Sequence, residues 1–259
     1  MIRVCVAGIT GWTGDPIARA IAAADDLELV SGVSRADAGT THADLGVPVL
    51  ASVPEALAAA QADVVVDYTA AAAVRENVLA ALDGGVSVVV GSSGLTAADF
   101  EEIEERARAA GVGVIAAGNF SLLAALLTRS AAKIARHVPS WEILDYASAS
   151  KPDVPSGTSR ELAERLAQTG GPTLGHPLKS LHGPVEARGA TVAGTQIHSV
   201  RLPSFVVSTE IVFAATGERL ILRHDAGETP APYLAGTLLA IRSVQDRVGL
   251  TRGLDALID

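Results

Sequence analysis

Apolar runs rich in β-branched residues alternate with helical patterns through the first half of the chain, and this alternation limits the fold most strongly. The runs are IRVCVAG at 2–8, LELVSGVS at 27–34, ADVVVDYT at 62–69, VSVVVGSSG at 86–94 and VGVIAAGNF at 112–120. Helical patterns follow them at 15–24, 54–61, 74–82, 96–110 and 122–137. Strands joined by helical crossovers at this spacing form parallel sheets. The sequence therefore predicts an α/β fold with a doubly wound parallel (Rossmann-type) sheet.

A different order of elements follows in the second half. After a strand SWEILDYASAS at 140–150 we expect a helix at Arg160–Gln168, and then a mobile loop over 170–194, which is rich in Gly, Pro and His. Three β-like runs come next, at 195–203, 205–215 and 218–226, and a helix at 232–248 is expected to close the chain. This order indicates an α+β domain with an open mixed sheet.

Composition excludes several classes of protein. Aromatic residues make up 3% of the 259 residues and hydrophobic residues 49%, so the core must be built from Ala, Val, Leu and Ile. The net charge of −9 argues against a nucleic-acid surface. We find no secretory leader and no apolar run as long as a membrane span, so we expect a cytoplasmic protein. The single cysteine, Cys5, is expected to be a buried filler rather than a catalytic thiol.

A glycine-rich loop lies between the first strand and the first helix. Gly8, Gly11 and Gly14 form G-x-x-G-x-x-G. Glycines let the backbone approach a pyrophosphate, and a helix N-terminus offers free N–H groups. The sequence therefore predicts a dinucleotide site, although a glycine turn without a ligand is the alternative. Trp12 in this loop could stack near the cofactor or shield the turn.

The end of the second strand bears on the choice of cofactor. NAD enzymes place an acidic residue there to bind the ribose. Here the sequence has Ser34 and Arg35, and a guanidinium suits a 2′-phosphate. NADPH is therefore the expected cofactor, while Asp37 leaves NADH possible.

The stretch KPDVPSGTS, residues 151–159, combines a lysine with a Gly-containing turn before a helix. Lys151 could bind a carboxylate and donate a proton, and the helix N-terminus could bind the same anion. In the alternative interpretation, Lys151 is solvated and Ser156 or Thr158 caps the helix, with Glu161 completing a capping box with Thr158.

Several other polar residues are candidates for a functional role. The six histidines have no metal-ligand spacing, so no metal site is expected. His176 and His182 lie in the Gly/Pro-rich segment and could close over a substrate, which is the less favoured reading. Arg201 could pair with a carboxylate or stabilise the sheet, and Asp67 is expected to make a structural hydrogen bond.

Stretches from one end of the chain to the other resemble the dihydrodipicolinate reductases, also called 4-hydroxy-tetrahydrodipicolinate reductases, of bacterial lysine synthesis. They are VAGITGWTG at 6–14, VVDYT at 65–69, VVVGSSGL at 88–95, AAGNFSLL at 116–123, KPDVPSGT at 151–158, IHSVR at 197–201, GERLILRHDA at 217–226 and AGTLLA at 235–240. Their order and spacing make the set more specific than the glycine loop alone.

The resemblance implies a role for each matching position. The pyrophosphate would be held by Gly8, Gly11, Trp12, Thr13 and Gly14. The adenosine phosphate would be bound by Ser34 and Arg35. The nicotinamide side would be lined by Tyr68, Thr69, Gly91, Ser92, Ser93, Ala117, Asn119 and Phe120. Lys151 would be catalytic, and the substrate would contact Ser148, Ser156, Gly157 and Thr158.

The resemblance also implies a division into domains. Residues 1–118 would form the dinucleotide-binding domain, completed by the C-terminal segment 229–259, which folds back onto it. Residues 119–228 would form the domain for substrate binding and oligomerisation. Members of the family are commonly homotetramers, so a homo-oligomer is expected.

The chain departs from the family around Lys151. The family usually has two adjacent histidines four and three residues before this lysine, where this chain has Ala147 and Ser148. A glutamate and a histidine on a later strand are replaced by Ser208 and Thr209, and GWTG stands where the family has a basic residue and a methionine.

These features lead to one main hypothesis, an NADPH-dependent reductase of a small carboxylated imine or conjugated imine. Either the lysine-pathway dicarboxylate is the substrate, with Lys151 acting without the histidines, or a different imine or oxo acid is. A non-catalytic NADP(H)-binding sensor is the alternative from another class, and the retained Lys151 counts against it.

Overall fold

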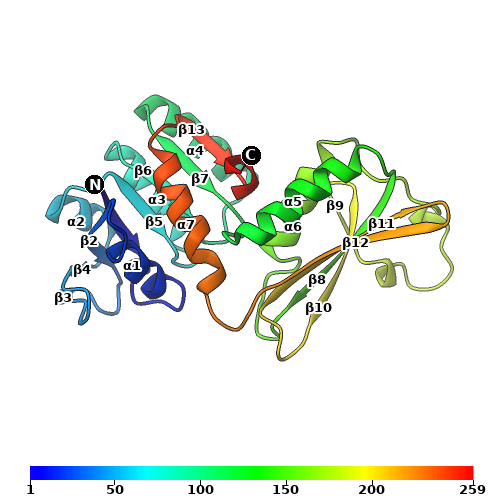
Figure 1. The fold of residues 1–259 in the computed structure, drawn as a ribbon, viewed down its shortest axis with the longest axis horizontal. Helices are drawn as coiled ribbons and strands as arrows, with labels where there is room; N and C mark the ends of the chain where they lie inside the picture. The colour runs from blue at the N-terminus through cyan, green and yellow to red at the C-terminus, as the bar shows by residue number, and fades with distance from the viewer. Residues whose placement is uncertain (259) are drawn as a thin grey trace. The chain divides into compact units, whose positions relative to one another are not determined.

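The structure, a computed structural model, describes residues 1–258 and divides the chain into two compact units (Figure 1). The first unit comprises residues 1–122 together with the C-terminal segment from Pro230. The second unit comprises Leu123–Thr229. The chain therefore leaves the first unit once and returns to it near its end.

An eight-stranded sheet forms the centre of the first unit, in the order β13-β7-β6-β5-β1-β2-β4-β3. The strands are β1 (Ile2–Ala7), β2 (Leu27–Val33), β3 (Thr40–Thr41), β4 (Pro48–Leu50), β5 (Val64–Asp67), β6 (Ser87–Val90), β7 (Gly113–Ala116) and β13 (Gly249–Arg252). All neighbouring pairs are parallel except β3 and β4. The direction of winding changes at β1, which lies between β2 and β5. The predicted doubly wound, Rossmann-type sheet is confirmed.

Helices cover both faces of this sheet (Figure 1). They are α1 (Gly14–Ala22), α2 (Val53–Ala59), α3 (Val74–Asp83), α4 (Ala97–Ala110) and α7 (Ala231–Val244). On one face, α2, α3 and α4 pack against the side chains of every second strand residue. On the other face, α1 and α7 contact each other, with α1 beside β2 and α7 beside β6. Because both faces are covered, every residue of β5, β6 and β7 is buried.

Cys5 lies on β1 in the core between the sheet and these helices, and its side chain is fully buried. Burial raises the pKa of the thiol to about 11. The thiol is therefore protonated at neutral pH, which fits a buried filler and not a catalytic nucleophile.

The end of the chain differs from the sequence-based expectation. The helix predicted over 232–248 ends at Val244, and β13 then adds a parallel strand beside β7, followed by the 3₁₀ turn η3 (Leu254–Leu257). The strand has four residues, GLTR, and begins with Gly249 at φ +86°. This segment is too short and too polar to show a strand pattern, so no periodicity indicates a strand there.

A five-stranded mixed sheet forms the second unit, in the order β12-β11-β8-β10-β9. The strands are β8 (Ser140–Ala147), β9 (Ala190–Val192), β10 (Thr195–Arg201), β11 (Val207–Ala215) and β12 (Glu218–Asp225). β10 runs parallel to β8, and the other neighbouring pairs are antiparallel. The predicted open mixed sheet of an α+β domain is confirmed.

Two helices pack on one face of this second sheet. α5 (Leu122–Ala135) and α6 (Gly157–Ala167) cover Trp141 and Ile143 of β8, whose burial alternates strictly along the strand. This alternation is expected for a strand with one face on the core. Asp145 and Ala147 follow Ile143 on the same buried face. Consequently the Asp145 carboxylate lies at a position where an apolar core residue is expected.

The segment 170–194 has more structure than the loop that we predicted. It contains the 3₁₀ turns η1 (Leu178–Ser180) and η2 (Val185–Arg188) as well as β9. Arg188 forms an ion pair with Glu142 of β8, and the carbonyl of Arg188 accepts a hydrogen bond from Gln196 at 2.7 Å. These contacts join distant residues, so no local pattern could indicate them.

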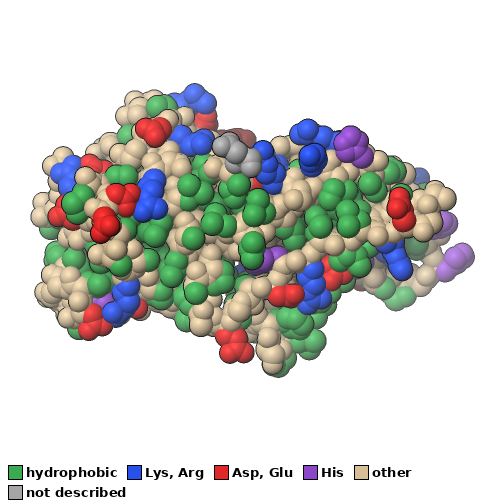
Figure 2. All heavy atoms as spheres, in the orientation of Figure 1, with side chains coloured by type: hydrophobic (Ala, Val, Ile, Leu, Met, Phe, Trp, Pro, Cys, Tyr) green, Lys and Arg blue, Asp and Glu red, His purple; other side chains and the backbone are tan. Residues whose placement is uncertain are grey.

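Charges of both signs are interspersed on the face drawn in Figure 2. Among the described residues, no helix is long and apolar enough to cross a membrane.

Candidate active site

The glycine loop after β1 folds back on itself. Gly8 has φ +85°, and a Cβ there would collide with the carbonyl oxygen of Tyr68. A Cβ on Gly14 would collide with the carbonyl oxygen of Gly8, and the Gly11 amide donates to that same oxygen at 2.9 Å. The tight turn alone therefore requires two of the three glycines.

Free N–H groups at the start of α1 distinguish a phosphate loop from a plain turn. Thr13 is the N-cap of α1, yet its side chain makes no capping hydrogen bond. Within residues 1–258, the amides of Trp12 and Thr13 have no acceptor. The Trp12 side chain is 57% exposed, so the protein does not use it to bury the turn. Unpaired amides at the positive end of a helix fit the pyrophosphate of NAD(P)H.

A cluster of hydroxyl groups around a carboxylate follows β2. Asp37 Oδ2 accepts hydrogen bonds from Ser34 Oγ at 2.7 Å and from Thr10 Oγ1 at 2.8 Å. These bonds from Ser34 and Thr10 lower the pKa of Asp37. Arg35 is exposed, and no described residue pairs with its guanidinium. The loop thus carries the anionic Asp37 and, two residues before it, the unpaired cation of Arg35.

Asp67 at the end of β5 connects three segments. Its Oδ1 accepts from the Thr69 amide at 3.1 Å, from Thr69 Oγ1 at 2.8 Å and from Ser92 Oγ at 2.5 Å. Its Oδ2 accepts from Asn77 Nδ2 of α3 at 2.8 Å. Asp67 is fully buried, which fits the structural hydrogen bonding expected for it. It fixes the loops that carry the predicted cofactor residues Thr69 and Ser92.

Two residues predicted to line the nicotinamide side point into the core. Phe120 is 2% exposed and packs edge-on against Tyr68, with ring centroids 5.9 Å apart. The Tyr68 hydroxyl is hydrogen-bonded to Thr237 Oγ1 of α7 at 2.7 Å, and burial raises the pKa of this phenol. The tyrosine ring passes so close to Gly91 that a Cβ there would overlap it. These side chains therefore support the loops from within.

The remaining predicted residues of this group follow β6 and β7. Ser93 is exposed, and Ala117 is 8% exposed. The Asn119 side chain accepts a hydrogen bond from the Ser121 amide at 2.8 Å, just before α5 begins. The predicted cofactor residues thus lie at the carboxyl ends of β1, β2, β5, β6 and β7, five adjacent parallel strands. Ligands bind at this edge in doubly wound sheets.

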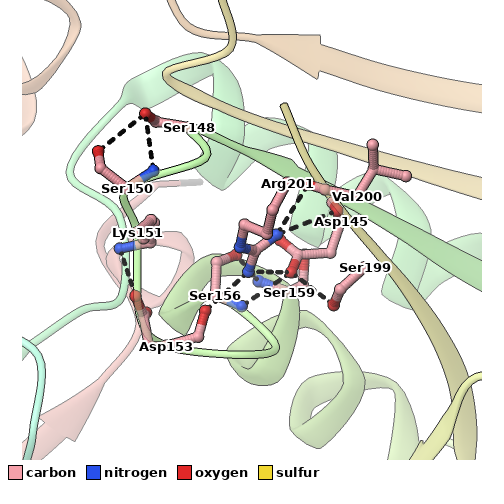
Figure 3. Close-up of polar contacts among 10 residues, drawn as sticks. All are labelled: Asp145, Ser148, Ser150, Lys151, Asp153, Ser156, Ser159, Ser199, Val200 and Arg201. Atoms are coloured by element: carbon pink, nitrogen blue, oxygen red, sulfur yellow. Dashed lines mark hydrogen bonds and ion pairs between the residues drawn. The ribbon is translucent and has the colours of Figure 1, made fainter. Parts of the chain in front are cut away.

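In the second unit, Lys151 lies in an ion pair (Figure 3). Its Nζ is 2.9 Å from Oδ1 of Asp153, and both side chains are more than one quarter exposed. Ser148 lies before it, with Oγ 3.0 Å from Oγ of Ser150. The segment ahead of Lys151 therefore presents hydroxyl groups in place of imidazoles.

Helix α6 begins earlier than we expected, at Gly157 instead of Arg160. Ser156 is its N-cap, and Ser156 Oγ accepts from the Ser159 amide at 3.3 Å. Of the two caps considered in the alternative interpretation, Ser156 is the one observed, while Thr158 lies in the first turn of the helix. The Gly157 amide donates no hydrogen bond to any described residue. The helix start is thus capped by Ser156 and also suited to an anion.

The structure adds residues that sequence reasoning missed, above all Asp145. This carboxylate is fully buried, and Arg201 Nη2 lies 2.8 Å from its Oδ2 (Figure 3). The two alternatives for Arg201 coincide here, because its carboxylate partner lies on the neighbouring strand β8 of the same sheet. A charged residue in phase with Trp141 and Ile143 was the available signal, because an inward position on such a strand is normally apolar.

Three of the positions at which the chain departs from the pattern of the family that it resembles are buried. Ala147 is fully buried at the end of β8. Ser208 and Thr209 on β11 are 3% and 2% exposed, and Thr209 Oγ1 lies 3.2 Å from Ser159 Oγ of α6. Small residues therefore pack into the core at these positions.

The histidines are spread over both units. His42 Nε2 lies 3.0 Å from Asp15 and His198 Nε2 lies 2.7 Å from Glu142, while His176 contacts Ser180. Among the described residues, no three His, Cys, Asp or Glu side chains gather to hold a metal ion. The interpretation of His176 and His182 as residues that close over a substrate stays a prediction.

A groove of about 620 Å³ lies at the opposite edge of the first sheet. Its lining includes Asp63, Gly84, Ser87, Val112 and Gln245, near the amino ends of β5, β6 and β7. None of the predicted cofactor residues lines it.

Comparisons with known proteins cover both units. Residues 2–120 match the family description "Dihydrodipicolinate reductase, N-terminus", and residues 121–257 match "Dihydrodipicolinate reductase, C-terminus". The 4-hydroxy-tetrahydrodipicolinate reductase of Moorella thermoacetica is 35% identical, with coverage of 100% of this chain and 98% of the relative. The corresponding protein of Beutenbergia cavernae is 37% identical, covering 100% and 99%. A dipicolinate-bound dihydrodipicolinate reductase from Paenisporosarcina sp. TG-14 superposes with a TM-score of 0.80 at 28% identity, covering 100% of both chains.

The doubly wound sheet with its glycine loop, followed by a unit with an open mixed sheet, defines a two-domain NAD(P)H-dependent oxidoreductase. Within that class, the chain belongs to the dihydrodipicolinate reductase family, whose members are reductases of lysine biosynthesis. The family, the enzyme class and the NAD(P)H cofactor expected from the sequence are confirmed.

Proposed function

We propose that this enzyme transfers hydride from NADPH to a small carboxylated imine or conjugated imine, and that the lysine-pathway precursor 4-hydroxy-tetrahydrodipicolinate is its substrate. The relatives that carry this name match the chain over its full length. The observation that carries the proposal is that an ammonium group, Lys151, and the N-terminus of α6, capped by Ser156, lie on one short segment. An ammonium and a helix N-terminus are the groups that a carboxylate substrate needs.

The residues of the second unit would bind and protonate the substrate. Bound NADPH supplies the hydride. A Lys151 ammonium can bind a substrate carboxylate and can donate a proton to the atom next to the reduced carbon. The Asp153 carboxylate lies 2.9 Å from Lys151 Nζ and orients the ammonium group. Gly157, Thr158 and the hydroxyls of Ser148 and Ser156 would complete the substrate contacts.

NADPH is proposed as the preferred cofactor because Arg35 is exposed and unpaired among the described residues. A 2′-phosphate would give this guanidinium a charge-assisted partner. Asp37 could bind ribose hydroxyls instead, although Ser34 and Thr10 already donate to it. This arrangement supports NADPH over NADH without excluding either.

A second candidate function rests on Ala147. The family usually has a histidine there, and in this chain the side chain is a buried methyl group. Histidine supplies both charge and proton transfer near neutral pH, so its absence favours a different imine or oxo acid as substrate. On chemistry alone this version is slightly ahead, but it names no specific substrate.

Assembly and location remain proposals as well. The face of the second sheet opposite α5 and α6 carries Leu144 and Val212, both partly buried, and the exposed Ile221. Glu142, Glu210 and Arg223 lie on the same face, so its surface is mixed, and the proposed homotetramer rests on the resemblance. We further propose a cytoplasmic enzyme.

Turnover measurements test the proposed function. Purified protein with NADPH is given 4-hydroxy-tetrahydrodipicolinate, a panel of cyclic imines, and oxo acids with ammonia, and NADPH absorbance is followed. We expect turnover of the lysine precursor. Turnover of another imine alone would establish the second candidate, and micromolar NADPH binding without turnover of any compound would indicate a sensor.

The role of Lys151 is tested in the same assay. Lys151→Ala should lower kcat by about 10²-fold or more if the lysine is the proton donor. Lys133→Ala, which removes an exposed lysine from α5, serves as the matched control and should leave kcat unchanged. A Lys151→Ala enzyme of normal rate would remove this residue from the mechanism.

A further inference from the structure

A buried carboxylate lies beneath the segment that carries Lys151. Asp145 faces the core between β8 and α6, and its side chain is fully buried. An ionised carboxylate at such a position is strongly unfavourable unless donors surround it. The groups that satisfy Asp145 therefore show what this charge is used for.

Four donors surround the Asp145 carboxylate (Figure 3). Oδ2 accepts from the Ser156 amide at 3.0 Å, from Ser199 Oγ at 2.9 Å and from Arg201 Nη2 at 2.8 Å. Oδ1 accepts from Ser159 Oγ at 3.1 Å. Burial by itself raises the pKa of Asp145, but the hydrogen bonds outweigh it and the net pKa is lowered. The group is therefore an anion at neutral pH, and it holds the start of α6 at Ser156.

Arg201 continues this network to the other side of the loop. Its Nη2 also donates to the carbonyl oxygen of Asp153 at 2.7 Å, and its Nη1 donates to the carbonyl of Val200 at 3.0 Å. The Asp153 side chain in turn lies 2.9 Å from Lys151 Nζ. The buried ion pair of Asp145 and Arg201 is thus hydrogen-bonded to the loop at two points. Arg201 binds the Asp153 carbonyl, and Asp145 binds the Ser156 amide.

We propose that Asp145 and Arg201 are positioning residues, which hold Lys151 through Asp153 and hold the Ser156–Thr158 turn directly. The inference rests on the proposed role of Lys151 in proton transfer. Neither residue needs to touch the substrate. Asp145 and Arg201 neutralise each other, so this pair adds no net charge beside Lys151 and Asp153.

The planar guanidinium of Arg201 is suited to this work. Through Nη1 and Nη2 it reaches Asp145 on β8, Val200 on its own strand and the Asp153 carbonyl, which lie in different directions. A lysine in its place would keep the charge but could not hold the three acceptors in one fixed plane. A displacement of the reacting groups by about 1 Å can cost about 10²-fold in rate. Arg201→Lys is therefore the sharpest variant.

The experiment compares Arg201→Lys and Asp153→Ala with a matched control, Thr195→Val. Thr195 is fully buried near the far end of β10, where it accepts a hydrogen bond from Trp141 Nε1 at 3.2 Å. Its replacement should destabilise the unit without touching the loop. For each protein, Tm, the Kd of NADPH, kcat and KM for the imine substrate, and the Kd of pyridine-2,6-dicarboxylate are measured.

We expect Arg201→Lys to lower kcat/KM by about 10²-fold, with the Kd of NADPH unchanged and the dicarboxylate bound more weakly. Asp153→Ala, at a partly exposed position, should fold normally, and its kcat should fall by nearly as much as that of Arg201→Lys. Thr195→Val should lower Tm and leave kcat/KM unchanged. Normal kcat/KM in both loop variants, or a similar loss in Thr195→Val, would overturn the proposal.

A double variant separates this inference from the proposed function. If Arg201 acts through Lys151, the kcat loss caused by Arg201→Lys should largely disappear in a Lys151→Ala background. Undiminished loss in that background would show that Arg201 acts by another route, against the inference. Normal activity of Lys151→Ala alone would refute the role of Lys151 itself.

Discussion

At the scale of single residues, Arg35 offers the clearest test of cofactor choice. Its guanidinium has no partner among residues 1–258, so its removal costs the folded protein no internal contact. Arg35→Ala should weaken NADPH binding by about 10- to 100-fold, because a hydrogen bond between charged groups contributes about 1.5–3 kcal/mol. The Kd of NADH, measured by calorimetry beside that of NADPH, should stay nearly constant.

A matched variant makes this test two-sided. Asp37→Asn removes the carboxylate that accepts from Ser34 and Thr10, and it should affect NADH at least as much as NADPH. Equal weakening of both cofactors by Arg35→Ala would refute the assignment of Arg35 to the 2′-phosphate.

Residues of the candidate site differ in how far the sequence could predict them. The glycine loop and Lys151 were found because their chemistry is local, with the functional groups within a few residues of one another. Asp145 was missed because its donors, Ser199 and Arg201, lie 54 and 56 residues further along the chain. The cluster of Thr10 and Asp37 has the same origin, since only the pairing of β1 with β2 brings it together.

At the scale of elements, Asp67 connects the end of β5 with α3 and with the loop after β6. Asp67→Asn would place an amide donor where Ser92, Thr69 or Asn77 now donates. We expect the free energy of unfolding to fall by about 1–3 kcal/mol, the cost of leaving a buried donor unsatisfied. Urea unfolding followed by circular dichroism measures this change.

Asp83→Asn is the control for that prediction. Asp83 is the last residue of α3, and its side chain is 67% exposed in an ion pair with Arg106. Exposed ion pairs contribute about 0–1 kcal/mol, so this variant should be nearly neutral. A comparable loss in both variants would show that Asp67 has no special role in joining the segments.

Elements were predicted well where their pattern was long and periodic. The buried strands and the helices α3, α4 and α5 begin within two residues of their predicted positions. The start of α6 was placed too late, because the buried Asp145 and the cap at Ser156 stabilise its first turn. β3, β4, β9 and β13 were missed, because they are short and, unlike the equally short β5, β6 and β7, do not lie in long apolar runs of buried residues. Neighbouring strands, not their own sequence, define them.

At the scale of the whole molecule, acidic side chains determine how stability depends on pH. The pKa of Asp63 is lowered by hydrogen bonds from Arg3, that of Glu104 by the Leu250 amide and Arg108, and that of Asp15 chiefly by Arg19. A carboxyl group whose pKa is lower in the folded state stabilises the fold above its unfolded pKa. This contribution is lost as the pH falls through the folded value.

Burial lowers the pKa of His224, so we expect the free energy of unfolding to fall slightly from pH 7 to about 5, and to decline more steeply below about pH 4 as these carboxylates are protonated. Urea titrations at a series of pH values measure the curve. Asp63→Asn should reduce stability at pH 7 and make the acid decline shallower. Stability that rises as the pH falls from 5 to 3 would contradict this account.

Because the Cys5 thiol is unreactive in the folded protein, a cysteine introduced elsewhere can be labelled selectively. Because the side chain is fully buried and its pKa is about 11, maleimide reagents at neutral pH should leave it unmodified while the protein is folded. One cysteine introduced at an exposed position such as Ala149 would then accept a single fluorophore beside the Lys151 loop. A dye at that position would report substrate binding, and the natural Cys5 would not have to be replaced first.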